Sequence, residues 1–139
     1  MKKIFLLMIM LMVSSISIAQ DFNIFGKWKA IDPDGEDIFL TFDKMRFIYI
    51  SNGIETYGGK AVDMGDGLKL DFTYEINMEN EPFSLDIVMH DINDRSTRLI
   101  KRGYFKIINK NTIALKQELF SDDNTWYEDL TELTFKRQN

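Results

Sequence analysis

Residues 68–76 read LKLDFTYEI, a run in which apolar and polar side chains alternate without a break. Successive side chains of an extended strand point to opposite faces, so this alternation predicts a strand with one apolar and one polar face. The apolar face contains Leu68, Leu70, Phe72, Tyr74 and Ile76, and the polar face contains Lys69, Asp71, Thr73 and Glu75. We expect the first face in the core and the second in water.

The same pattern repeats on both sides of this run. Residues 83–90 alternate in the same way, and no segment from Phe22 onward keeps the spacing of an amphipathic helix over several turns. Turn sequences separate the runs, and Asn52-Gly53 between two β-rich runs is a strong hairpin signal. We therefore predict strands at residues 26–31, 37–42, 46–50, 54–61, 68–76, 83–90, 98–108, 112–119 and 130–136.

Short strands with hairpin-length connections predict an all-β fold. We expect an up-and-down antiparallel meander of about eight strands that closes into a barrel, because closure removes the unpaired edges of an open sheet. A β-sandwich is the alternative, since the spacing of the turns does not separate the two architectures. The absence of a long crossover connection favours the barrel. A membrane-spanning barrel is disfavoured, because one face of the strands carries many charges where lipid would lie.

The N-terminal segment has the features of a secretory signal peptide. Two lysines precede an apolar run at residues 4–13, and Ser17 and Ala19 offer the small side chains that signal peptidase requires. We predict a signal peptide at residues 1–19 and one domain at residues 20–139, exported by a Sec-type route to the periplasm or the extracellular space. An uncleaved transmembrane anchor is the alternative.

Composition limits the partners of this domain. Loss of the two N-terminal lysines would change the net charge from −5 to −7. Such a field repels phosphate backbones and anionic lipids, so we expect no nucleic-acid partner and no stable membrane anchor after cleavage. Because the chain contains no cysteine, we predict no disulfide and no lipoprotein anchor. We expect a monomer.

The residue types present argue against catalysis. With one histidine and no cysteine, the chain lacks the residues for a histidine zinc cluster or a cysteine nucleophile. It contains no Gly-x-Ser-x-Gly sequence, phosphate-binding glycine loop or dinucleotide fingerprint. Asp71, Glu75 and Asp86 fall on the predicted outer faces, whereas a catalytic carboxylate pair needs a shared cleft. We therefore predict no enzyme activity, no catalytic residue, no metal site and no cofactor.

On several predicted strands, polar or aromatic residues fall on the same face as the residues expected in the core. A barrel interior lined by phenols and a few fixed charges can orient a small ligand. The candidate pocket residues on this ground are Arg46, Tyr57, Tyr74, Arg102, Tyr104 and Gln117. The alternative for each is structural, because an arginine can extend to the surface and a tyrosine can fill the core with its hydroxyl at the rim.

Several short motifs resemble those of the small exported bacterial lipocalin-like proteins, which are β-barrels of the calycin type. They are Gly26-Lys27-Trp28, Leu40-Thr41-Phe42 followed by Arg46-Phe47, Gly103-Tyr104-Phe105, and Phe135-Lys136-Arg137. The resemblance implies that Gly26 and Trp28 lie at the barrel floor, where the tryptophan plugs one end and Arg137 packs across its ring. It also implies that the barrel encloses small apolar molecules.

Two hypotheses about function follow. The first is an exported, non-catalytic lipocalin-like barrel that binds a small, partly apolar molecule in its interior. The second is a ligand-free barrel, filled by its own side chains, that acts as a protein-interaction or inhibitor module. Both stay open because a barrel of about eight strands is just wide enough either to be filled or to hold one small ligand.

Overall fold

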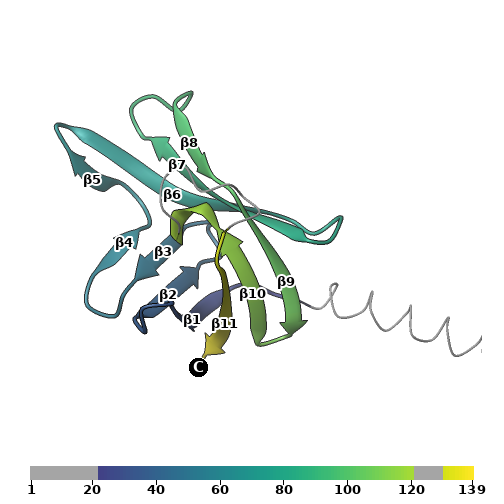
Figure 1. The fold of residues 1–139 in the computed structure, drawn as a ribbon. Helices are drawn as coiled ribbons and strands as arrows, with labels where there is room; N and C mark the ends of the chain where they lie inside the picture. Colours follow the sequence, from purple (N-terminus) through teal and green to yellow (C-terminus); the bar gives the residue numbers. More distant parts are fainter. Residues whose placement is uncertain (1–21, 121–129) are drawn as a thin grey trace, which may run out of the picture.

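One antiparallel sheet curls into a nearly closed barrel in the computed structural model, which describes residues 22–120 and 130–139 (Figure 1). The signal peptide predicted at residues 1–19 lies outside the described residues. No helix in the described part is long and apolar enough to cross a membrane. The elements are β1 (Gly26–Ile31), β2 (Asp37–Phe42), β3 (Ile48–Ser51), β4 (Thr56–Gly58), β5 (Val62–Gly65), β6 (Leu68–Asn77), β7 (Phe83–Asp91), β8 (Arg98–Lys101), β9 (Gly103–Asn109), β10 (Thr112–Gln117), the 3-10 helix η1 (Glu118–Phe120) and β11 (Glu132–Gln138).

The strands are ordered around the barrel much as they are along the chain. The path through the sheet is β4-β3-β2-β1-β11-β10-β9-β7-β6-β5, with β8 paired to β7. The first strand pairs with the last over residues 27–29 and 136–138, so that Trp28 lies opposite Arg137. Every strand pair in the described residues is antiparallel, which confirms the predicted meander.

A few backbone contacts close the other side of the barrel. The path through the sheet ends at β4 and β5, and an isolated bridge joins Phe47 to Thr73 across the gap. Beside it, the amide of Tyr74 donates to the carbonyl of Arg46 at 3.1 Å. The β5–β6 and β7–β8 hairpins extend beyond the rest of the barrel (Figure 1). The barrel is therefore nearly closed.

The prediction of about eight strands is wrong, because the sheet contains eleven. The strand predicted at 54–61 gives only β4, which ends at Gly58, where φ is +106° and an added Cβ would lie 2.3 Å from the carbonyl oxygen of Ile48. The chain then forms β5, where the sequence predicts a turn. The strand predicted at 98–108 is interrupted at Arg102, so that it appears as β8 and β9.

Most other predicted strands are present with small shifts. β1 and β2 have the predicted bounds, and β6 and β7 each end one residue later. β3 begins two residues late because Arg46 takes a φ of +73°, which lies outside the β region. The strand predicted at 112–119 ends at Gln117, where η1 follows, and the last strand is shifted by two residues.

The inward faces of the strands fill the barrel with side chains. The largest fully buried side chains are Trp28, Tyr74, Phe42, Phe105, Phe135, Leu40, Ile48, Leu85, Ile87, Ile113, Leu115 and Gln117. Several of the rings are in contact, such as Phe42 and Tyr74, whose centroids lie 5.0 Å apart in a T-shaped arrangement. Buried aromatic rings contribute large apolar areas to a core, so this chain can fold without disulfides.

Asp71 departs from the predicted alternation of core and water. It lies on the outer face of β6, where the sequence predicts a solvated carboxylate, but only 7% of the residue is exposed. Its carboxylate accepts a hydrogen bond from the amide of Ala61 at 2.8 Å. In the same segment, the carbonyl of Gly59 accepts from the amide of Phe72 at 2.8 Å. The connection between β4 and β5 thus binds to β6 and excludes water from Asp71.

Candidate functional site

Trp28 packs against the segment that precedes β1. Its ring is fully buried, and its indole nitrogen donates to the carbonyl of Ile24 at 2.8 Å. The ring of Phe22 packs against it with the centroids 6.1 Å apart, so the segment before β1 folds back under the barrel. Gly26 permits this path because its φ is +113°, a conformation that glycine adopts without steric cost.

Arg137 holds this N-terminal segment from the opposite strand. Its guanidinium carbon lies 4.3 Å from the centroid of the Trp28 ring. Nη1 donates to the carbonyl of Phe25 at 2.6 Å, and Nη2 donates to the carbonyls of Asn23 and Lys110. Burial lowers the pKa of the Arg137 guanidinium below its ordinary value, but the group remains charged at neutral pH. One side chain therefore ties the segment before β1 to the β9–β10 turn.

A cavity of about 340 Å³ opens beside the segment before β1, and we name it the end pocket. It lies between the segment before β1, the β2–β3 turn and the end of β6. Its walls are Phe22, Asn23, Ile24, Phe25, Arg46, Tyr74, Ile76 and Met78. Most of these side chains are apolar, and Arg46 is the one cation among them. Apolar walls with a few placed polar groups are typical of sites that bind small organic molecules.

Arg46 reaches the end pocket through an uncommon backbone conformation. Its φ of +73° lies in the left-handed region that residues other than glycine rarely adopt. Two hydrogen bonds hold it there: its amide donates to the carbonyl of Asp43 at 3.3 Å, and its carbonyl accepts from the amide of Tyr74 at 3.1 Å. Such strain costs about 1–3 kcal/mol and clusters at functional sites. Arg46 is exposed, so its charge is accessible to a ligand.

Tyr74 forms the wall next to this arginine. The guanidinium carbon of Arg46 lies 5.8 Å from the centroid of the Tyr74 ring, which is within the range of a cation–π contact. The Tyr74 hydroxyl donates to the carbonyl of Asp43 at 2.8 Å. Burial raises the pKa of this hydroxyl above its ordinary value, while the charge of Arg46 acts in the opposite direction. The neutral phenol therefore positions Arg46 and the β2–β3 turn.

The end pocket combines one cation with mostly apolar walls. Arg46 can pair with a carboxylate or another anion, and Phe22, Ile76 and Met78 can cover an apolar body. No histidine, cysteine, serine or carboxylate is among the residues that line it, and these are the usual general bases and nucleophiles. In residues 22–120 and 130–139, no group of three or more His, Cys, Asp or Glu side chains could hold a metal ion.

Of the six candidate pocket residues, the structure brings two together. Arg46 and Tyr74 both line the end pocket. Gln117 is buried inside the barrel, where its amide nitrogen donates to the carbonyl of Leu85 at 3.0 Å and its amide oxygen accepts from the amide of Leu119 at 3.3 Å. Its polar atoms are thus used within the protein, and it helps to connect β7, β10 and η1.

The other three candidates lie elsewhere. Tyr57 is 58% exposed on β4, and its hydroxyl donates to the carboxylate of Glu55 at 2.7 Å. Arg102 is exposed at the break between β8 and β9, where its amide donates to the carboxylate of Glu118 at 2.9 Å. Tyr104 is half-buried on β9, between two buried neighbours in the strand. These residues do not form one pocket in the barrel interior.

Six residues of the end pocket were not among the candidates from the sequence: Phe22, Asn23, Ile24, Phe25, Ile76 and Met78. The sequence does offer a signal for Met78. It continues the alternation that places Leu70 and Phe72 on the apolar face of β6, one step beyond the end of the strand. Phe22 and Ile24 belong to the segment ahead of the first strand, but nothing in the sequence indicates that this segment lines a pocket together with the end of β6.

Comparison of the chain with protein-family models, with curated proteins and with solved structures finds no significant match.

Proposed function

We propose that this protein is an exported, non-catalytic, lipocalin-like barrel that binds a small, partly apolar anion in the end pocket. The observation that supports this best is the position of Arg46, whose left-handed backbone holds a cation at an apolar cavity of about 340 Å³. An anionic group of the ligand would pair with Arg46. The apolar part of the ligand would lie against the rings and aliphatic side chains of the walls.

The end pocket is preferred to the barrel interior as the binding site, because side chains occupy the interior. Trp28, Phe42, Phe105 and Phe135 are fully buried there. A ligand in the same space would have to displace packed rings, and removing one buried ring costs about 3–5 kcal/mol. The end pocket requires no such displacement.

The contact between Arg137 and Trp28 supports the lipocalin-like relationship. The resemblance implies an arginine across the tryptophan ring, and the guanidinium carbon of Arg137 lies 4.3 Å from the centroid of the Trp28 ring. The nearly closed antiparallel barrel is compatible with the same relationship. The proposal retains the predicted export, the monomeric state and the absence of a cofactor.

Binding of dodecanoate and of dodecanol, measured by calorimetry, tests the proposed ligand class. We expect dodecanoate to bind about tenfold more tightly than dodecanol, because only the carboxylate can form a charge-assisted hydrogen bond with Arg46. The Arg46→Gly variant should lose this preference without loss of stability, since glycine adopts the left-handed conformation freely. The matched control is Arg102→Gln, at an exposed arginine outside the pocket. Equal binding of the two probes, or an unchanged preference in Arg46→Gly, would overturn the proposal.

Native mass spectrometry of the protein purified from its own compartment tests whether a natural ligand exists. We expect a co-purified small anion that is lost from Arg46→Gly and retained by Arg102→Gln.

A second candidate function is favoured by the filled interior. A barrel packed with its own rings has no need of a ligand, so the protein could act as a protein-interaction or inhibitor module through its outer surface. This candidate predicts a ligand-free protein whose melting temperature does not change across a library of lipids, sterols and aromatic molecules, since any ligand of the folded state would raise it.

A further inference from the structure

The β1–β2 turn is organised around the side chain of Asp32. One oxygen of the Asp32 carboxylate accepts hydrogen bonds from the amides of Asp34 and Glu36 at 2.9 and 2.8 Å. The carbonyl of Asp32 accepts from the amide of Gly35 at 3.0 Å, and its amide donates to the carbonyl of Glu36 at 2.9 Å. The aspartate therefore holds the turn through its side chain and its backbone together, as is typical of an Asx-type turn.

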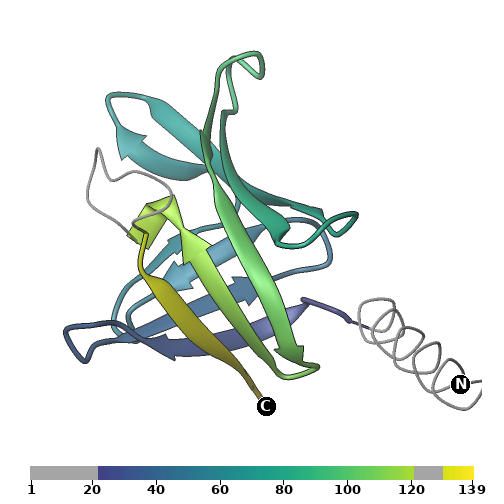
Figure 2. The same cartoon turned by 45° about the vertical axis from the view of Figure 1, so that its right-hand side comes forward.

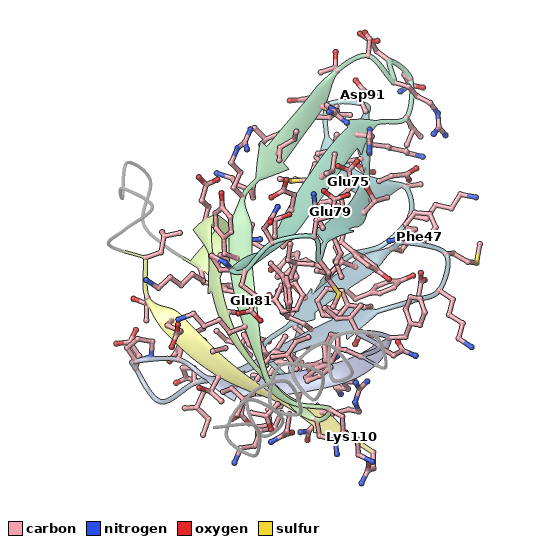
Figure 3. The ribbon with its side chains drawn as sticks, turned by 90° about the vertical axis from the view of Figure 1, so that its right-hand side faces the viewer. Phe47, Glu75, Glu79, Glu81, Asp91 and Lys110 are labelled. Atoms are coloured by element: carbon pink, nitrogen blue, oxygen red, sulfur yellow. The ribbon has the colours of Figure 1, made fainter. Side chains whose placement is uncertain are left out.

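The β2–β3 turn has the same hydrogen-bond pattern around Asp43. One oxygen of the Asp43 carboxylate accepts from the amides of Met45 and Phe47, both at 2.9 Å. The carbonyl of Asp43 accepts from the amide of Arg46 at 3.3 Å, and its amide donates to the carbonyl of Phe47 at 3.1 Å. The two turns lie at opposite ends of β2 (Figure 2). Phe47, which is labelled in Figure 3, marks the end of the β2–β3 turn.

The two turns differ at the left-handed position, which is the third residue after the aspartate. This residue is Gly35 in the β1–β2 turn, with a φ of +84°, and Arg46 in the β2–β3 turn, with a φ of +73°. Glycine adopts this conformation without steric cost, whereas a residue with a Cβ does not. The β2–β3 turn therefore carries a backbone cost that the β1–β2 turn avoids. What the arginine adds is a guanidinium at the end pocket, 5.8 Å from the centroid of the Tyr74 ring.

The carboxylate of Asp43 holds the backbone of the turn and leaves the guanidinium of Arg46 unpaired. Within residues 22–120 and 130–139, Arg46 forms no ion pair. Asp43 is also connected to the wall of the pocket, because its carbonyl accepts from the hydroxyl of Tyr74 at 2.8 Å. It does not itself line the pocket. Asp43 is thus placed to act on a ligand only through Arg46.

We propose that Asp43 is the positioning residue of the end pocket. Its carboxylate oxygen fixes the left-handed conformation of Arg46 and thereby directs the guanidinium over Tyr74, where it meets the anionic group of the ligand. This inference rests on the proposed function, and it names the residue on which the preference for an anion depends. Because Asp43 acts as a hydrogen-bond acceptor at a fixed place, the geometry of its oxygen matters and its charge does not.

Calorimetry with dodecanoate and dodecanol on variants of the two turns tests this role. Asp43→Ala should reduce the roughly tenfold preference for dodecanoate to about twofold or less, because the amides of Met45 and Phe47 lose their acceptor and Arg46 leaves its position. Asp43→Glu keeps the charge but displaces the acceptor, and it should lose the preference too. Asp43→Asn keeps an acceptor oxygen in place and should retain the preference. Asp32→Ala is the matched control, because it removes the same two bonds from the other turn, and it should bind like the parent protein.

Nuclear Overhauser effects between the side chain of Arg46 and the ring of Tyr74, measured without ligand, separate this inference from the proposed function. We expect them in the parent protein, in Asp43→Asn and in Asp32→Ala, and we expect their loss in Asp43→Ala and Asp43→Glu. Persistence of the ring contact in both of the latter variants, or failure of Asp43→Asn together with them, would overturn the positioning role. Loss of the contact in these variants, combined with equal binding of the two probes by the parent protein, would uphold the role of Asp43 and refute the proposed ligand class.

Discussion

The guanidinium carbon of Arg137 lies 4.3 Å from the centroid of the Trp28 ring, and the two residues are direct partners in the pairing of the last strand with the first. This contact has consequences beyond the cation–π attraction. Arg137 also donates hydrogen bonds to the carbonyls of Phe25 and Asn23, so it fixes the segment that carries the front wall of the end pocket. Arg137 therefore contributes both to the packing around Trp28 and to the shape of the end pocket.

Trp28→Ala should lower the free energy of unfolding by about 3–5 kcal/mol, because it removes a fully buried ring and leaves a cavity at the barrel floor. Urea denaturation followed by circular dichroism measures the change. Ile31→Ala, at a position that is 61% exposed, serves as the control and should change stability little. An unaltered midpoint in Trp28→Ala would contradict the role of this ring as a plug.

Arg137→Lys should destabilise the protein by about 2–3 kcal/mol although it keeps the positive charge. Lysine cannot reproduce the planar fork that bonds to the carbonyls of Phe25, Asn23 and Lys110, and at least one of these acceptors would lose its partner. Thermal unfolding measures the loss. The neighbouring exposed Lys136→Ala is the control, and equal melting temperatures of the two variants would show that the fork contributes nothing.

Gly103→Ala should destabilise the protein by about 1–3 kcal/mol through overpacking. An added Cβ would lie 2.6 Å from Nε2 of Gln117, 2.7 Å from the carbonyl oxygen of Leu85 and 2.9 Å from that of Lys116. Two of these neighbours are backbone atoms, so the strands themselves would have to move apart. In the comparison variant Gly35→Ala, nothing lies within 4 Å of the added Cβ, and only the positive φ of +84° opposes the substitution. Chemical denaturation of both variants separates the steric cost at Gly103 from a backbone cost.

Stability should fall more steeply above pH 10 in the parent protein than in Tyr74→Phe. Burial raises the pKa of the Tyr74 hydroxyl above its unfolded value of about 10. The neutral phenol therefore contributes its full stabilisation below that pH, and the contribution is lost as pH rises through the folded pKa. Melting temperatures between pH 8 and 11 measure the difference. A Tyr74→Phe profile parallel to that of the parent would refute the expectation.

Local patterns were sufficient for most strands. Strict alternation at residues 68–76 predicted β6, and the turn residues at 32–35 separated β1 from β2 with the correct bounds. These features depend on side-chain direction and on turn chemistry within a few residues, both of which are readable along the chain. The number of strands was predicted wrongly at two places. β4 ends at Gly58, where an added Cβ would meet the carbonyl oxygen of Ile48, and the chain leaves the sheet at Arg102, whose amide donates to the carboxylate of Glu118.

The candidate site was predictable only in part. Strand parity singled out Arg46 and Tyr74, which line the end pocket, but it also singled out Tyr57, which is 58% exposed. Parity alone does not show whether a strand stays in the barrel wall or leaves it, as β4 does after Gly58. The contribution of Phe22 depends on a chain reversal that Arg137 stabilises from the far end of the sequence.

Local side-chain patterns were enough to predict the β class and the positions of most strands and turns, because each of these follows from the period of side-chain direction and from turn chemistry. They did not predict every core residue, since Leu68 on the expected core face is 40% exposed. Three features depend instead on contacts between distant parts of the chain: the open part of the barrel, the burial of Asp71 beneath the β4–β5 connection, and the separation of β1 and β11 beyond Lys29 and Lys136. These contacts depend on strand register. Pairing between distant strands depends on the packing of the whole wall, and a local pattern contains no information about which distant backbone groups will meet.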